Sequence, residues 1–181
     1  PKNPDKILNK ETVEKILAEI KAEKQGIIKT VKKEDKQEAP PLLHSLTSLQ
    51  REANSVHGFS AAKTLSIAQG LYETQKIISY PRTDSQHLGE AGKGLAKEVL
   101  KKLSKDALIP EVDNVGKRVF DDSKLSDHHA LIPLAPPTQN LGPDEMKLYI
   151  LIARKFTGAF MPLYKFQKTT LITGIKEYDF I

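Results

Sequence analysis

The sequence predicts a mixed α+β fold: a mainly helical domain with a helix-turn-helix-like pair, inserted into a small β-rich domain. Two observations support this prediction. Strand-like segments occur near both ends of the chain, at residues 26–32 and 166–173, and amphipathic helices lie between them. Because an isolated strand cannot satisfy its backbone hydrogen-bonding groups, we expect the two end segments to pair with each other.

The composition excludes several classes of protein. The chain has 181 residues, a formal net charge of +5 and 39% hydrophobic residues. No run of roughly 18 apolar residues occurs, so we expect no membrane span, and no signal-peptide pattern is present. The Cys count of 0 excludes disulfides, thiolate metal sites and cysteine nucleophiles. The first residue is Pro1 rather than Met, and the last residues are strand-like, so we expect a piece of a larger protein.

The first predicted elements are a helix and an edge strand. Asn9 can cap the helix, and Gly26 is placed to end it. Its apolar residues recur at helical spacing: Val13, Ile16, Leu17 and Ile20. Residues 26–32 are rich in β-branched side chains and predict the strand. The charged residues 32–41 end in two prolines and predict a linker.

The middle of the chain predicts three helices. Residues 45–56 form the first, which Gly58 ends, and Ser60 caps the second. Two short helices joined by a glycine-containing turn are typical of a helix-turn-helix, although the shape is common. A third helix is expected from Leu88 to Leu103, weakened by three glycines in its first half. Short strands are expected at 118–120 and 130–134.

The last predicted helix has the clearest signals. Pro143 takes the favoured first position, and Pro162 stops the helix. One apolar stripe consists of Met146, Tyr149, Ile150, Ala153, Phe156 and Phe160, and further apolar residues flank it, so we expect burial on most sides. A strand over residues 166–173 follows.

The segment from Ser79 to Ser85 places ionisable and hydroxyl groups on a turn between two apolar segments. Tyr80 precedes a proline and is therefore pushed towards an extended backbone, which puts its side chain on the same face as that of Arg82. A guanidinium beside a phenol lowers the phenol's pKa and can bind a phosphate, so the pair could attack a phosphodiester. Thr83 and Ser85 add hydroxyl donors that suit phosphate oxygens. By itself, however, a Tyr-Pro-Arg tripeptide is more often a turn with a surface arginine.

A second candidate lies in residues 126–133. His128 or His129 could transfer protons near neutral pH or bind phosphate as a cation, and Asp127 could orient a neighbouring imidazole. The alternative is one exposed histidine and one packed in the core. The five histidines show no zinc-binding spacing, and the sequence contains no phosphate-binding loop, so we predict no metal site in this chain.

Four blocks in fixed order resemble the type IA DNA topoisomerases, and the Ser-Tyr-Pro-Arg form resembles the bacterial topoisomerase III branch most. The blocks are residues 46–54, 58–61, 67–73 and 78–85, a stretch of about 40 residues. The resemblance runs from about Leu42 to the C-terminus, and the first 25 residues carry no matching signature. Leu134 departs from the family, which usually has Thr there.

The resemblance implies a reaction and roles for particular residues. Tyr80 matches the nucleophile, which cleaves single-stranded DNA, forms a 5′-phosphotyrosine and later reseals the strand without ATP. Arg82 matches the arginine that positions the tyrosine and the phosphate, and His128 matches the active-site histidine better than His129 does. Thr83, Ser85 and His129 are then expected to contact DNA.

The resemblance also implies a domain organisation. A partial, β-rich arch domain is expected at residues 1–44 and 166–181, with the helical, nucleophile-bearing domain at 45–165. The family's acidic Mg²⁺-binding domain lies outside this chain, so we expect Mg²⁺ in the intact enzyme only. Single-stranded DNA and the missing domains are the expected partners, the location is expected to be cytoplasmic and nucleoid-associated, and the piece alone is expected to be inactive.

A non-enzymatic helix-turn-helix module that reads duplex DNA is the alternative function. Such a reader usually presents several arginine or amide side chains on its second helix. The second helix here carries one cation, Lys63, so the pattern is poor for base readout.

Overall fold

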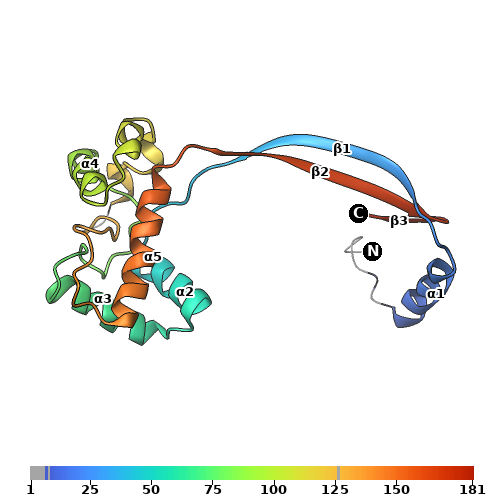
Figure 1. Ribbon diagram of the computed structural model, residues 1–181, viewed down its shortest axis with the longest axis horizontal. Coiled ribbons are helices and arrows are strands. Elements are labelled where there is room, and N and C mark those ends of the chain that lie inside the picture. Colours follow the sequence, from blue (N-terminus) through green and yellow to red (C-terminus); the bar gives the residue numbers. More distant parts are fainter. Residues whose placement is uncertain (1–6, 8, 126) are drawn as a thin grey trace. The chain divides into compact units, whose positions relative to one another are not determined.

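The computed structural model describes residues 7, 9–125 and 127–181 and divides into two compact units (Figure 1). One unit combines the N-terminal part, up to Glu38, with Lys165–Ile181. The other is Ala39–Tyr164. The mixed α+β prediction is confirmed, since both helices and a sheet are present. In the described residues, no helix is long and apolar enough to cross a membrane.

The first unit contains α1 (Lys10–Lys21) and the strands β1 (Ile27–Glu38), β2 (Tyr164–Ile175) and β3 (Tyr178–Phe180). The strand order is β1-β2-β3, so the segments near the two ends of the chain pair as predicted. The Asn9 side chain caps α1 by accepting from the Thr12 N–H at 3.1 Å. β2 and β3 are antiparallel, and Gly174 lies opposite Asp179.

The prediction of a linker at residues 32–41 is wrong for most of that segment, because β1 continues to Glu38. Almost every side chain of β1 is exposed. A strand that buries neither face needs no apolar alternation, since backbone pairing with its neighbour satisfies its polar groups. Gln167 of β2 also donates to Asp35 of β1 at 3.3 Å. The charged residues of this segment thus indicate that the strand is exposed, and they do not indicate a linker.

The second unit contains α2 (Leu46–His57), α3 (Ala61–Glu73), α4 (Lys93–Lys102) and α5 (Pro143–Ala159). Its short 3₁₀ turns are Glu90–Gly92, Asp106–Leu108, Pro110–Asp113, Gly116–Arg118 and Asp122–Lys124. Ser45 caps α2 in a capping box, Gly58 ends α2 at a φ of 68°, and Ser60 caps α3. The local capping signals were thus sufficient to predict where these two helices begin and where α2 ends.

Three predicted elements differ from the structure. The helix expected from Leu88 is replaced by a 3₁₀ turn before α4, because the glycines disfavour a continuous helix there. Leu88 instead forms an isolated bridge with Phe120. The strands expected at 118–120 and 130–134 are likewise reduced to isolated bridges, which include His44 with Leu131 and Ile78 with Pro133.

Helix α5 crosses the second unit and contributes to both of its core clusters (Figure 1). Near its start, Leu148 and Ile152 pack with residues of α2 and α3. Near its end, Phe156 packs with Phe160 and with residues of α4. Each such side chain contributes roughly 1.5–3 kcal/mol on burial. Ile150 was expected in the buried stripe, but it is 44% exposed.

Candidate active site

The segment that precedes Tyr80 is fixed by a second segment much later in the chain. Ser79 is buried, its N–H donates to the Ile132 carbonyl at 2.9 Å, and its hydroxyl accepts from the Ile132 N–H at 2.9 Å. The Ser79 hydroxyl also donates to the Ala130 carbonyl at 3.2 Å. Because the later segment also carries His128, these bonds bring the two candidate motifs together.

The ring of Tyr80 lies between two other rings. The centroid of the His128 ring is 4.5 Å away, with 50° between the planes. The Tyr72 ring meets it edge-on, at 5.4 Å and 76°. Tyr80 is half-buried and His128 is exposed, so the pair lies at the surface of its unit. The structure therefore joins two of the three predicted catalytic residues.

Arg82, the third predicted catalytic residue, is exposed. Its guanidinium makes no hydrogen bond or ion pair with any residue that the structure describes. Five N–H donors thus remain available on a residue two positions from Tyr80, in a planar arrangement that suits a phosphate.

Thr83 and Ser85 lie inside the fold, with exposed fractions of 4% and 5%. The Thr83 hydroxyl donates to the His128 carbonyl at 3.3 Å and accepts from the Ser85 N–H at 3.1 Å. The Ser85 hydroxyl lies 3.2 Å from the Lys124 carbonyl and accepts from the His87 N–H at 3.1 Å. These internal bonds support a positioning role for both hydroxyls and do not support direct contact with DNA.

The two adjacent histidines differ in their surroundings. The His129 ring is half-buried, and its Nδ1 donates to the Ala130 carbonyl at 2.7 Å. His128 is the histidine whose ring lies against Tyr80. The structure therefore places the His128 ring, and not the His129 ring, against Tyr80. Asp127, which is exposed beside His128, makes no hydrogen bond or ion pair with the other described residues.

Tyr72 was not predicted as a site residue from the sequence. It lies near the end of α3 and helps to line a pocket of about 410 Å³ with Glu73, Lys76, Ile78 and Leu134. The only signal in the sequence was an aromatic residue shortly before the Tyr80 segment. That signal is weak, because the contact between the two rings depends on the path of the chain from α3 to Tyr80.

A family model described as DNA topoisomerase matches residues 1–181, the whole chain. The chain belongs to the DNA topoisomerase family. DNA topoisomerase 3 of Bacillus subtilis is 36% identical over 176 residues, which are 92% of this chain and 24% of the relative. DNA topoisomerase 3 of Bacillus licheniformis is 37% identical over 161 residues, which are 84% of this chain and 22% of the relative.

A solved structure agrees with these matches. The full-length topoisomerase I from Thermotoga maritima superposes with a TM-score of 0.66 at 26% identity, over 95% of this chain and 28% of that chain. Together the comparisons place this topoisomerase chain with the type IA, topoisomerase III-like branch. The chain spans about a quarter of the length of the curated relatives it matches.

A Mg²⁺ site in a protein needs carboxylate or other oxygen ligands close together. In the part of the chain that the structure describes, no three His, Asp or Glu side chains gather in a way that could hold a metal ion.

The helix pair α2–α3 does not present the side chains of a duplex reader. Lys63 of α3 forms an ion pair with Asp144 at 2.7 Å, and its Nζ lies 4.4 Å from the centre of the Phe59 ring. The cation that could have contacted bases is thus engaged within the fold, and no observation favours the helix-turn-helix alternative.

Proposed function

We propose that the full-length topoisomerase cleaves and reseals one strand of DNA through a covalent bond to Tyr80. The observation that supports this most is the contact between the Tyr80 and His128 rings, with the exposed guanidinium of Arg82 two residues further on. A nucleophile, a group that can move a proton and a phosphate-binding cation are the components that such a reaction requires.

In the cleavage step, the phenolic oxygen of Tyr80 attacks the phosphorus of a phosphodiester in single-stranded DNA. The bond from phosphorus to the 3′ oxygen breaks, the phenol loses its proton, and the leaving 3′ oxygen takes one up to become a hydroxyl. The product is a 5′-phosphotyrosine. Attack by the 3′ hydroxyl reverses every bond change, so resealing consumes no ATP and regenerates Tyr80.

Each neighbouring residue has a distinct role in this proposal. Arg82 binds the non-bridging oxygens of the scissile phosphate and stabilises the charge that develops on them. His128 orients the phenol and exchanges its proton, since histidine is the side chain that most often transfers protons in enzymes. Thr83 positions the His128 segment through its bond to the His128 carbonyl.

Trapping of the covalent intermediate tests the proposal. A single-stranded oligonucleotide labelled at its 3′ end should leave its label on the full-length protein after denaturation, because the downstream fragment carries the 5′ phosphate. The variant Tyr80→Phe should give no labelled protein, and the neighbouring variant Tyr72→Phe should still give it. A labelled adduct in Tyr80→Phe, or an adduct that carries a 5′-end label, would refute the assignment.

We further propose that the complete reaction needs parts of the polypeptide that this chain does not contain, together with Mg²⁺ bound by them. The support is that the chain matches about a quarter of the length of its relatives. Residues 1–181 alone are then expected not to relax a negatively supercoiled plasmid in the presence of Mg²⁺. Relaxation by the purified 181-residue chain would contradict this part of the proposal.

A further inference from the structure

Residues 43–46 lie between the two segments that carry Tyr80 and His128. On one side, the Leu46 N–H donates to the Thr83 carbonyl at 2.8 Å, and the Gln86 side chain donates to the Leu43 carbonyl at 3.1 Å. On the other side, the His44 carbonyl accepts from the Leu131 N–H at 2.8 Å. A displacement of residues 43–46 would therefore change the position of the Tyr80 loop, the His128 segment, or both.

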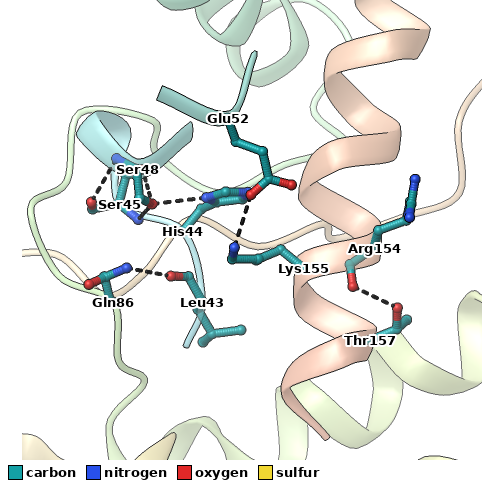
Figure 2. Close-up of polar contacts among 9 residues, drawn as sticks. All are labelled: Leu43, His44, Ser45, Ser48, Glu52, Gln86, Arg154, Lys155 and Thr157. Carbon is teal, nitrogen blue, oxygen red and sulfur yellow. Dashed lines mark hydrogen bonds and ion pairs between the residues drawn. The ribbon is translucent and has the colours of Figure 1, made fainter. Parts of the chain in front are cut away.

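The side chain of His44 anchors this segment in the interior (Figure 2). It is 1% exposed, and its Nδ1 forms a hydrogen bond of 2.9 Å with the Ser48 hydroxyl of α2. Its Nε2 lies 3.6 Å from the Glu52 carboxylate, which accepts from Lys155 of α5 at 2.9 Å. The imidazole thus links residues 43–46 to α2 through Ser48, and its Nε2 lies near the carboxylate that joins α2 to α5.

The surroundings of His44 favour the neutral form of its ring. Burial lowers the pKa of His44 to about 4, against the raising effect of Glu52 and with the lowering effect of Lys155, so the ring is neutral near pH 7. Its buried Nε2 has no hydrogen-bond partner in the described structure. The charged groups that act on His44 are Glu52 of α2 and Lys155 of α5. The segments around Gln86 and Leu131 contribute only a side-chain amide and backbone groups to the surroundings of residues 43–46.

We propose that His44 is a positioning residue, which keeps the Tyr80 loop and the His128 segment at the spacing that strand cleavage requires. The proposal rests on the proposed function of Tyr80 and adds a residue that contacts neither DNA nor the reacting atoms. Displacement of reacting groups by about 1 Å can lower a rate about 100-fold, even when the change is remote from the chemistry. Loss of His44 should therefore lower the rate of cleavage more than the affinity for DNA.

The kinetic test uses the full-length protein in excess over a labelled oligonucleotide, where kcat denotes the maximal single-turnover rate of cleavage and KM the protein concentration that gives half of it. His44→Leu should lower kcat about 10- to 100-fold and leave KM within about twofold, because the binding surface is unchanged. His44→Asn, whose amide can take the place of Nδ1 beside Ser48, should recover most of the rate. The matched control is Val112→Ala, a buried residue in the 3₁₀ turn that packs on α4. It should lower the melting temperature but retain kcat.

A structural readout separates this inference from the proposed chemistry. In the 181-residue chain, nuclear Overhauser contacts between the Tyr80 and His128 rings should disappear in His44→Leu and persist in Val112→Ala. Ring contacts that persist in His44→Leu together with an unchanged kcat would overturn the inference, and so would an equal loss of kcat in the control. A covalent adduct in Tyr80→Phe would instead refute the chemistry, even if His44→Leu separates the rings.

Discussion

The ring of His128 lies 4.5 Å from the ring of Tyr80, centroid to centroid, and its neighbour His129 is held by the Ala130 carbonyl. Two adjacent histidines thus occupy different environments, and this difference predicts different effects of substitution.

Replacement of His128 should impair cleavage, and replacement of His129 should not. A side chain that moves a proton in the transition state typically contributes 10²- to 10⁴-fold to a rate, so we expect His128→Ala to lower the cleavage rate of the full-length enzyme by about 100-fold. His129→Ala is the matched control and should change the rate by less than about threefold. Formation of the 3′-labelled adduct over time measures both. If the two variants lose equal activity, the ring contact does not identify the histidine that acts.

Neither alanine nor lysine should support efficient cleavage in place of Arg82. Its exposed guanidinium can form two parallel hydrogen bonds with a phosphate, which an ammonium group cannot reproduce. We expect Arg82→Ala to lower kcat/KM for cleavage about 100-fold and Arg82→Lys to recover less than about a tenth of that loss.

Arg51 provides the control for charge alone. It is an exposed arginine on α2, and Arg51→Ala removes the same charge at a position outside the Tyr80 loop. This variant should retain cleavage within about threefold. Full activity in Arg82→Lys would show that charge at this position suffices, and the bidentate role would then be wrong.

The edge-on contact between Tyr72 and Tyr80 should matter through its ring and not through its hydroxyl. An aromatic pair contributes about 1 kcal/mol beyond its buried area, which corresponds to roughly fivefold in a rate if the contact orients the nucleophile. Tyr72→Ala should therefore cleave about fivefold more slowly, and Tyr72→Phe should match the wild type. Equal loss in both variants would assign the effect to the hydroxyl instead.

The sequence alone predicted features that depend on local signals. Ser45, Gly58 and Ser60 specify the ends of α2 and α3 by capping, which involves residues a few positions apart. The pairing of β1 with β2 followed from the need to satisfy backbone groups. The extent of β1 did not, because an exposed strand carries no alternation that could distinguish it from a linker.

Features of the site that depend on distant partners were not predicted. The buried Thr83 donates to the His128 carbonyl, and the ring of His44 bonds to Ser48 and lies near Glu52, both on α2. No spacing within one segment reveals such contacts. The motif could thus indicate which residues are candidates for the chemistry, whereas the roles proposed for Thr83, Tyr72 and His44 required the fold.

The stability of the chain should depend on pH through His44. In the unfolded chain an imidazole binds a proton below its ordinary pKa of about 6.5, whereas in the folded chain burial lowers the pKa of His44 to about 4. Between these values the unfolded state binds more protons, so the free energy of unfolding falls as the pH falls from about 6.5 to about 4. The full contribution of His44 is present above pH 6.5, and its loss by pH 4 should be on the order of 2–3 kcal/mol.

Urea unfolding of the 181-residue chain at several values of pH measures this dependence. His44→Phe removes the titrating group but keeps a ring. The free energy of unfolding of the wild type should therefore fall relative to that of the variant as the pH falls below 6.5. Carboxylates remote from His44, such as Asp144, whose pKa is lowered by hydrogen bonds from Lys63 and Lys147, affect both proteins alike and cancel in the difference. A difference that stays constant from pH 7.5 to pH 4 would show that His44 titrates normally in the folded chain, which would contradict its neutral, buried state.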